Sequence, residues 1–321
     1  MAVVVGAWAA SVVAAFSNWI HQTTSFPSGY LMVASSSDGT RLAVAVNGDY
    51  IYTSGDSGAT WIKQTASGSR IWQSITMSAT GQYIYASSGR GSGQGVYLSS
   101  DYGTTWALKS SYINGFVRTS SSGQYAIGSA DSYYGYSSAG AWISNDYGVT
   151  WRQGISTSGL TMNAVATDAS GKYMIAAVER AFYTSTDYGA TFTAQSIIYS
   201  GDTRIQAIVS DASGQYVAVI TDVYLYTSSN YGVTNTRAGW FPADSFGHQC
   251  FSMASDATGQ HLAFTTQGGG GGKIYLSSDY GATLVAQSPT PHTYYWDAIA
   301  SDSTGTKLIA VTLVNNVDTL S

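Results

Sequence analysis

The sequence predicts an all-β repeat fold, because one turn signature recurs at nearly constant intervals and a second signature follows it in most repeats. In the first signature, a glycine in a polar turn separates two apolar, β-rich segments. A period of 40–50 residues is typical of the four-stranded blade of a propeller. We therefore expect a seven-bladed β-propeller of four-stranded antiparallel blades, forming a single domain over residues 1–321. The seven glycines are Gly39, Gly81, Gly123, Gly171, Gly214, Gly259 and Gly305, at steps of 42, 42, 48, 43, 45 and 46 residues.

Each repeat supplies the same elements in the same order. A short apolar strand such as 207–209 precedes the turn, and a β-rich strand such as 216–220 follows it. Glycine tolerates the positive φ that tight hairpins need, which explains its place in the turn. The repeats place the blades at about 29–70, 71–112, 113–161, 162–203, 204–247 and 248–295, with the last formed by 296–321 together with 1–28.

The second signature reads Ser-x-Asp-x-Gly-x-Thr-Trp and occurs six times. Its aspartate can accept hydrogen bonds from backbone N–H groups of its own turn. Its glycine supplies an unusual φ, and its aromatic residue is expected to pack between blades. The fifth copy departs from the pattern, because Asn230 replaces the aspartate and Asn235 replaces the tryptophan, so we expect its blade to be the weakest. We assign a structural role in the turn to Asp56, Asp101, Asp146, Asp187, Asn230 and Asp279.

This second signature resembles the Asp-box, also called the bacterial neuraminidase repeat. The Asp-box is found in sialidases, sortilin-like receptors, photosystem assembly factors and lectin-like propellers. Six copies at blade spacing cover nearly the whole chain, so the resemblance implies the propeller fold. It does not imply one activity, because the family includes unrelated functions.

The two ends of the chain are expected to share the last blade. No second signature follows Gly305, but residues 18–23 (Asn-Trp-Ile-His-Gln-Thr) match 60–65 (Thr-Trp-Ile-Lys-Gln-Thr), the strand that follows a box. Such a closure leaves no free sheet edge. The apolar run 2–16 is similar to the core of a signal peptide, but no Lys or Arg precedes it, and we interpret it as part of this closing blade. Insertions are expected at 131–140 and 268–272.

Composition excludes several classes of partner. Only 10% of the residues are charged, the net charge is −5 and no basic run occurs, which argues against a nucleic-acid ligand. The run 2–16 is too short for a membrane span, which needs about 20 residues. The single cysteine, Cys250, excludes an internal disulfide and leaves the redox compartment open.

Enzymatic activity is not expected. The family resemblance implies that a sialidase needs an arginine triad, a tyrosine nucleophile activated by a glutamate, and an acid/base aspartate. The Arg-Ile-Pro motif of that family is absent, Arg41 follows a hairpin turn, and the only glutamate, Glu179, lies between two strands. His248 and Cys250 are two residues apart, which is weak evidence for a metal site, so we predict no metal and no cofactor.

Polar side chains recur just before the innermost strand of the repeats, next to aromatic residues. Amides, carboxylates and flat aromatic rings are the groups that hold sugars. The alternative is that these groups cap strand ends and bind water in the channel. As ligand-binding candidates we name Trp72, Gln73, Asn114, Asn163, Gln206, Trp296 and Asp297.

The sequence therefore favours a binding module over an enzyme. The first hypothesis is a lectin-like module with repeated shallow sites, acting outside the cell or at its surface. The second is a structural or assembly protein whose tyrosine-rich faces bind a protein surface or form a homo-oligomer. A glycoside hydrolase of the sialidase type is the third and is disfavoured.

Overall fold

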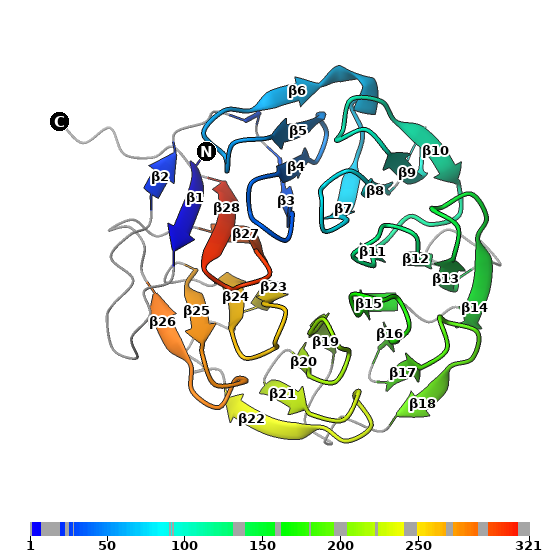
Figure 1. Cartoon of the computed structure of the whole chain (residues 1–321), viewed down its shortest axis with the longest axis vertical. Coiled ribbons are helices and arrows are strands. Elements are labelled where there is room, and N and C mark those ends of the chain that lie inside the picture. The colour runs from blue at the N-terminus through cyan, green and yellow to red at the C-terminus, as the bar shows by residue number, and fades with distance from the viewer. Residues whose placement is uncertain are drawn as a thin grey trace.

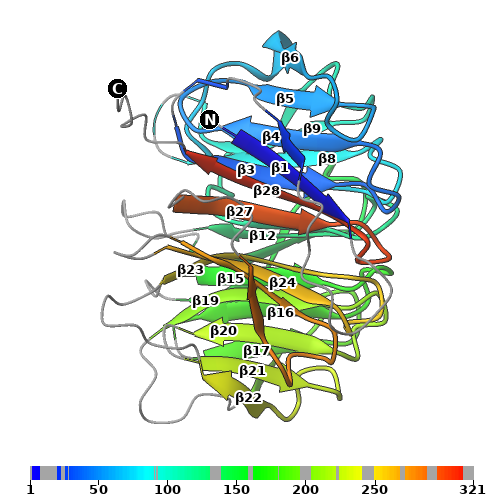
Figure 2. The same cartoon turned by 90° about the vertical axis from the view of Figure 1, so that its left-hand side faces the viewer.

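The chain forms a disc of β-sheets arranged around a central channel (Figure 1). Seen from the edge, the strands run across the thickness of the disc, from one face to the other (Figure 2). The computed structural model describes residues 2–7, 20–22, 26–27, 29–89, 91, 93–130, 139–157, 162–179, 181–195, 204–221, 224–240, 249–267, 272–287 and 295–313.

Blades 1 to 4 each contain four consecutive strands in antiparallel order, with the first strand innermost (Figure 1). Blade 1 is β3 (Leu31–Ser35), β4 (Leu42–Val46), β5 (Ile51–Ser54) and β6 (Ile62–Gln64), followed by the short 3-10 helix η1 (Thr65–Ser67). Blade 2 is β7 (Trp72–Met77), β8 (Ile84–Ser88), β9 (Gly95–Ser99) and β10 (Ala107–Ser110). Blade 3 is β11 (Val117–Thr119), β12 (Ala126–Ala130), β13 (Gly140–Ser144) and β14 (Arg152–Ser156). Blade 4 is β15 (Met162–Thr167), β16 (Met174–Val178), β17 (Ala181–Ser185) and β18 (Thr193–Gln195).

Blades 5 and 6 repeat this order, and the remaining sheet, blade 7, combines strands from both ends of the chain. Blade 5 is β19 (Ile205–Ser210), β20 (Val217–Thr221), β21 (Tyr224–Ser228) and β22 (Thr236–Trp240). Blade 6 is β23 (Gln249–Ser255), β24 (Leu262–Gln267), β25 (Ile274–Ser277) and β26 (Val285–Gln287). Blade 7 runs from β27 (Tyr295–Ser301) through β28 (Lys307–Leu313) and β1 (Ala2–Ala7) to β2 (Ile20–Gln22).

The prediction of an all-β propeller with four-stranded antiparallel blades is confirmed. In blade 7, β1 pairs with β28 in the register Val3 to Val311, and with β2 in the register Val4 to His21. The insertions predicted at 131–140 and 268–272 lie mainly outside the described residues. Among the residues that the structure describes, no helix is long and apolar enough to cross a membrane.

The course of each blade gives the disc two different faces. The turn between the first and second strands and the Asp-box between the third and fourth strands lie at one end, which we call the box face. The turn between the second and third strands and the connection to the next blade lie at the other end, which we call the entry face. The two kinds of turn on the box face are joined directly, as where the Tyr147 N–H donates to the Gln124 carbonyl at 3.0 Å.

The first turns of all the blades are linked around the channel at the box face. In each one, the residue two positions before the turn glycine donates its N–H to the corresponding carbonyl of the next blade, at 2.8–3.1 Å. The last bond, from Ser303 to Ser37, joins blade 7 to blade 1 and completes the circle. We call this the turn ring, and it consists of Ser37, Ala79, Ser121, Ala169, Ala212, Ala257 and Ser303.

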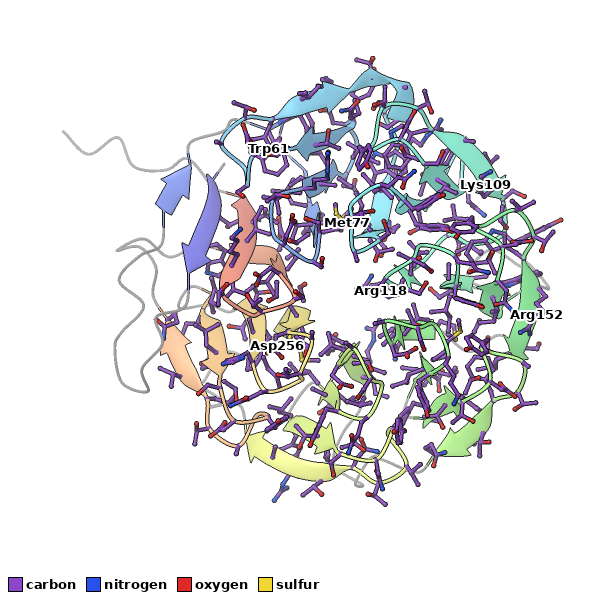
Figure 3. All side chains as sticks on the ribbon, viewed as in Figure 1. Trp61, Met77, Lys109, Arg118, Arg152 and Asp256 are labelled. Carbon is purple, nitrogen blue, oxygen red and sulfur yellow. The ribbon has the colours of Figure 1, made fainter. Side chains whose placement is uncertain are left out.

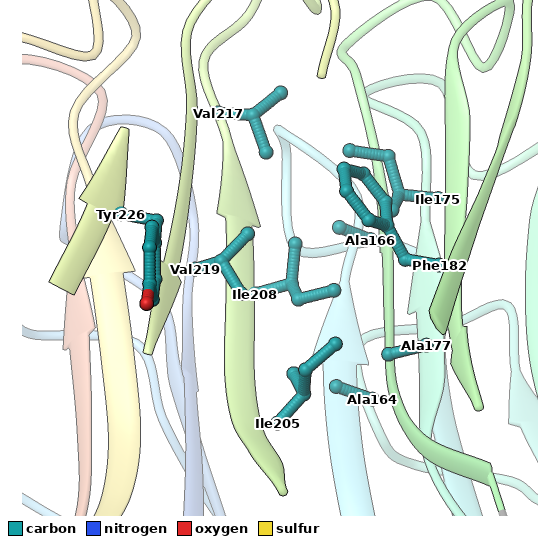
Figure 4. Close-up of a cluster of buried hydrophobic side chains, with 10 residues drawn as sticks. All are labelled: Ala164, Ala166, Ile175, Ala177, Phe182, Ile205, Ile208, Val217, Val219 and Tyr226. Carbon is teal, nitrogen blue, oxygen red and sulfur yellow. The ribbon is translucent and has the colours of Figure 1, made fainter. Parts of the chain in front are cut away.

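The hydrophobic core is divided among the seams between blades. At the seam of blades 4 and 5, small residues on one sheet, such as Ala164 and Ala166, face larger ones on the next, such as Ile205 and Ile208 (Figure 4). Small residues opposite large ones let neighbouring sheets approach closely and exclude water. Because each blade buries its faces against its two neighbours, the stability of one blade depends on the next.

Candidate functional site

The Asp-box forms a closed hydrogen-bond network within its own turn. In blade 2 the Ser99 hydroxyl donates to Asp101 Oδ1 at 2.8 Å and accepts the Gly103 N–H at 2.8 Å. The Thr105 N–H donates to Asp101 Oδ1 at 2.8 Å, and the Thr105 hydroxyl donates to Asp101 Oδ2 at 2.7 Å. Both carboxylate oxygens are thus bonded inside the turn, the geometry predicted for a structural aspartate. The same pattern holds at Asp56, Asp146, Asp187 and Asp279.

These bonds favour the ionised aspartate. At Asp187 the hydroxyl and then the N–H of Thr191 lower the carboxyl pKa from 3.8 to about 2, and at Asp56 the same groups of Thr60 have the same effect. The folded pKa lies below the unfolded value, so the stabilisation is complete above about pH 4 and is lost as the pH falls through about 2.

We expect Asp187→Asn to flatten the acid branch of the stability curve. As the pH falls below 4, the wild-type protein loses the stabilisation that comes from the ionised Asp187 carboxylate. The amide of the variant does not titrate, so this contribution to the pH dependence is absent. Since Asp187 is only half-buried, the difference should stay below about 1 kcal/mol after solvent screening. Urea unfolding between pH 2 and pH 5 measures it. Equal slopes for wild type and variant would contradict this assignment.

The box of blade 5 shows what its two substitutions change. Asn230 Oδ1 still accepts the Thr234 N–H at 2.9 Å. At the tryptophan position, the Asn235 Nδ2 group donates to the Gly232 carbonyl at 3.0 Å, just as the indoles of three other boxes donate to their own glycines at 2.8–3.1 Å. Within the described residues, Asn235 Oδ1 is a buried oxygen without a hydrogen-bond partner.

We expect Asn235→Trp to stabilise the protein by about 1–3 kcal/mol. The indole N–H would keep the bond to Gly232, the unpaired oxygen would be removed, and apolar surface would be buried. Chemical denaturation measures the change. The matched control is Asn235→Leu, since the box of blade 6 has a leucine, Leu284, at the equivalent position. This variant should gain less stability, because leucine cannot donate a hydrogen bond to Gly232.

Tyrosine pairs bridge neighbouring blades on the box face, and the sequence analysis did not single them out. A tyrosine after one turn stacks on the box tyrosine of the next blade, for example Tyr173 on Tyr231 with ring centroids 4.4 Å apart. The box tyrosines have φ between 58° and 62°, a left-handed conformation that non-glycine residues rarely adopt. The recurrence of tyrosine at both positions was the available signal. The pairs are Tyr83–Tyr147, Tyr125–Tyr188, Tyr173–Tyr231 and Tyr216–Tyr280.

Four of the predicted site residues share a feature of the backbone that the sequence did not reveal. Gln73, Asn163, Gln206 and Asp297 each occupy a β-bulge in an innermost strand, near the entry face. A bulge inserts one extra residue and turns its side chain away from the regular alternation. Asn114 lies outside this set, half-buried in the connection before β11.

The side chains of the four bulge residues differ in their exposure and therefore in whether a ligand could reach them. Asn163 is buried and donates from Nδ2 to the Glu179 carbonyl at 3.1 Å. Asp297 is buried and accepts the Leu31 N–H at 3.3 Å, which links blade 7 to blade 1. Gln206 is half-buried, and Gln73 is exposed. Asn163 and Asp297 therefore support the strand ends, while Gln73 is open to a ligand.

Trp72 and Trp296, two of the ligand-binding candidates, are not open to a ligand for stacking. Their side chains are 0% and 1% exposed, each in the core of a seam. The Trp72 indole N–H donates to the Asp49 carbonyl of blade 1 at 3.0 Å, and its ring meets Tyr97 edge-on. The bulge explains the error, because it leaves the tryptophan facing the seam and turns the next residue outward.

A different aromatic ring is available at the entry face. Tyr112, in the connection between blades 2 and 3, is 54% exposed. One face of its ring lies on Trp142, with centroids 5.6 Å apart and the planes 17° from parallel. A ring supported on one face and open on the other is a suitable surface for stacking. Tyr30, before β3, is also exposed on this face.

One charged side chain of an innermost strand points toward the channel. Arg118 on β11 lies at the channel wall (Figure 3), where its Nη1 group donates to Ser74 Oγ at 3.0 Å and to the Val117 carbonyl at 2.8 Å. Burial lowers the pKa of this guanidinium. Ser74 in turn bonds the backbone of Val117, so the arginine is part of the junction between blades 2 and 3.

Two of the groups considered for catalysis or metal binding, Glu179 and Cys250, lie in different blades. Glu179 is exposed at the tip of the turn between β16 and β17 with φ of 51°, as predicted. Cys250 is buried, which raises its thiol pKa to about 12, while His248 lies outside the described residues. Within the described segments, no three His, Cys, Asp or Glu side chains come together as metal ligands.

The chain is a β-propeller similar in fold to proteins of different activities. No protein-family model matches it, and no curated protein matches it in sequence. The xyloglucanase of family GH74 from Xanthomonas campestris superposes with a TM-score of 0.66 at 15% identity, over 88% of this chain and 51% of the xyloglucanase. This chain therefore spans about half the length of that enzyme.

Ycf48 is a second similar structure. Ycf48 from Cyanidioschyzon merolae superposes with a TM-score of 0.60 at 17% identity, over 90% of this chain and 96% of Ycf48. Ycf48 bound to a D1 peptide gives the same TM-score at 13% identity, over 89% and 92% of the two chains. At these identities the likeness shows the fold alone.

Proposed function

We propose that this protein is a non-catalytic, lectin-like binding module on a seven-bladed ring, and that it holds carbohydrate at the entry face. The stack of Tyr112 on Trp142 carries the proposal. An open tyrosine ring matches the apolar C–H face of a pyranose, and the exposed amide of Gln73 on the adjoining blade can bond to hydroxyl groups. The site is shallow, so each contact should be weak and multivalent display should strengthen binding.

We expect Tyr112→Ala to weaken binding to a glycan surface by about two- to tenfold, since one aromatic stack contributes roughly 0.5–1.5 kcal/mol. The melting temperature should change little, because the ring is largely exposed. A glycan array followed by titration on the best ligand measures the loss. The matched control is Tyr188→Asn, which removes a half-exposed tyrosine of the box face and should keep full binding.

The second candidate function is assembly with a protein surface. The peptide complex of the similar Ycf48 propeller favours it, as do the exposed rings of Tyr30 and Tyr112. If the wild-type protein binds no glycan on the array, the carbohydrate proposal is wrong. Loss of a protein contact or of self-association in Tyr112→Ala would then support the assembly function.

A further inference from the structure

One seam on the box face contains a pocket that is much larger than the one at the seam between blades 5 and 6. Between blades 1 and 2 the pocket has a volume of ≈ 220 Å³, and its walls include Arg41, Gln64 and Tyr102. At the corresponding position between blades 5 and 6 the space is only ≈ 10 Å³. Residues of blade 1 that depart from the repeat line the larger space.

Two residues that line the pocket depart from the repeat. The position after the first turn is a tyrosine in blades 2 to 5, but in blade 1 it is Arg41. Its guanidinium carbon lies 3.9 Å from the centroid of the Tyr102 ring, whereas the seams from blades 2 and 3 to blades 5 and 6 have a pair of tyrosines here. The second position of the box is Gly55 in blade 1 and Ser, Asn or Thr in the others, and a Cβ at Gly55 would meet nothing within 4 Å.

The pocket combines a cation with an apolar floor. Arg41 is a permanent cation, and the ion pairs found among the described residues, Lys63–Asp49 and His261–Asp256, do not include it. Leu42, Met77 and Ile84 form the floor and are buried, with Met77 labelled in Figure 3.

Stacking on Tyr102 uses one face of the guanidinium and leaves its N–H edges available. Such an edge matches the two oxygens of a carboxylate in a bidentate contact. A volume of ≈ 220 Å³ equals about seven water molecules at ~30 Å³ each, so the ligand must be small. We infer that this seam binds a small organic carboxylate, with the carboxylate on Arg41 and a compact apolar body on Leu42 and Ile84.

Benzoate is a suitable probe, and benzamide is its uncharged counterpart. We expect the wild-type protein to bind one benzoate with Kd of about 0.1–3 mM, because so small a ligand can supply only a modest binding free energy. Ligand-detected NMR and calorimetry measure the binding. Benzamide and inorganic phosphate should bind at least tenfold more weakly, because the first lacks the charge and the second the apolar body. Equal binding of either would overturn the assigned ligand class.

The variant Arg41→Tyr restores the residue of the other seams. It should abolish benzoate binding and leave the melting temperature unchanged or higher. The matched control is Arg237→Tyr, which removes the cation from the Arg237–Tyr224 stack outside the pocket and should bind as the wild type does. Gly55→Ser narrows the pocket without touching Arg41, and it should weaken binding. Wild-type binding by Arg41→Tyr, or no binding by the wild-type protein, would overturn the inference.

Discussion

We expect Trp72→Ala to lower the free energy of unfolding by about 3–5 kcal/mol, the usual cost of removing a fully buried tryptophan. The side chain packs against Ala43, Ala45 and Ile51 of blade 1, so its loss would leave a cavity in a seam rather than in one sheet. It would also leave the Asp49 carbonyl without its indole donor. Equilibrium unfolding in urea measures the effect.

The control for this prediction is Tyr112→Ala, a truncation of an aromatic ring on the neighbouring seam that should cost less than about 1 kcal/mol because the ring is exposed. The difference in stability between the two variants distinguishes a buried aromatic ring of the core from an exposed ring of the proposed binding site. If Trp72→Ala kept wild-type stability, the tryptophan could not occupy the position described here.

The second large effect is expected at a turn glycine. Gly171 has φ of 80°, and a Cβ added there would lie 2.3 Å from Cβ of Tyr125 on the preceding blade. In Gly171→Ala the left-handed conformation costs about 1–2 kcal/mol, and the forced separation of blades 3 and 4 adds ~1–3 kcal/mol.

Gly48→Ala isolates the two contributions, because Gly48 has φ of 83° but a Cβ there would meet nothing within 4 Å. It should lose only the conformational part, about 1–2 kcal/mol. Urea unfolding of both variants gives the contact energy by difference. Equal losses would mean that the blades can separate at no cost.

The fold could be predicted because its two turn signatures recur in the sequence at the spacing of one blade. The turn glycines and the boxes mark the same two turns in successive repeats, and the hydrogen bonds of Asp101 follow from the chemistry of that turn. The repeats do not predict how the side chains of one blade pack against the next blade. The stacking of Tyr173 on Tyr231 and the pocket beside Arg41 depend on that placement.

The error at Trp72 has a different cause. Regular alternation along a strand assigns neighbouring residues to opposite faces, but the bulge at Gln73 adds a residue that no pattern of hydrophobicity marks. A comparison of equivalent positions would have helped, because Met162, Ile205 and Cys250 occupy the corresponding places and are also buried.

The turn ring has an electrical consequence for the molecule. In an α-helix the peptide dipoles align from end to end, so the ends carry partial charges and unpaired groups. In the turn ring each N–H points to the carbonyl of the next blade, and the bond from Ser303 to Ser37 brings the last dipole back to the first. The seven bonds therefore form a closed circle around the channel with no first or last member, so the N–H and the carbonyl of each turn-ring residue already have a partner.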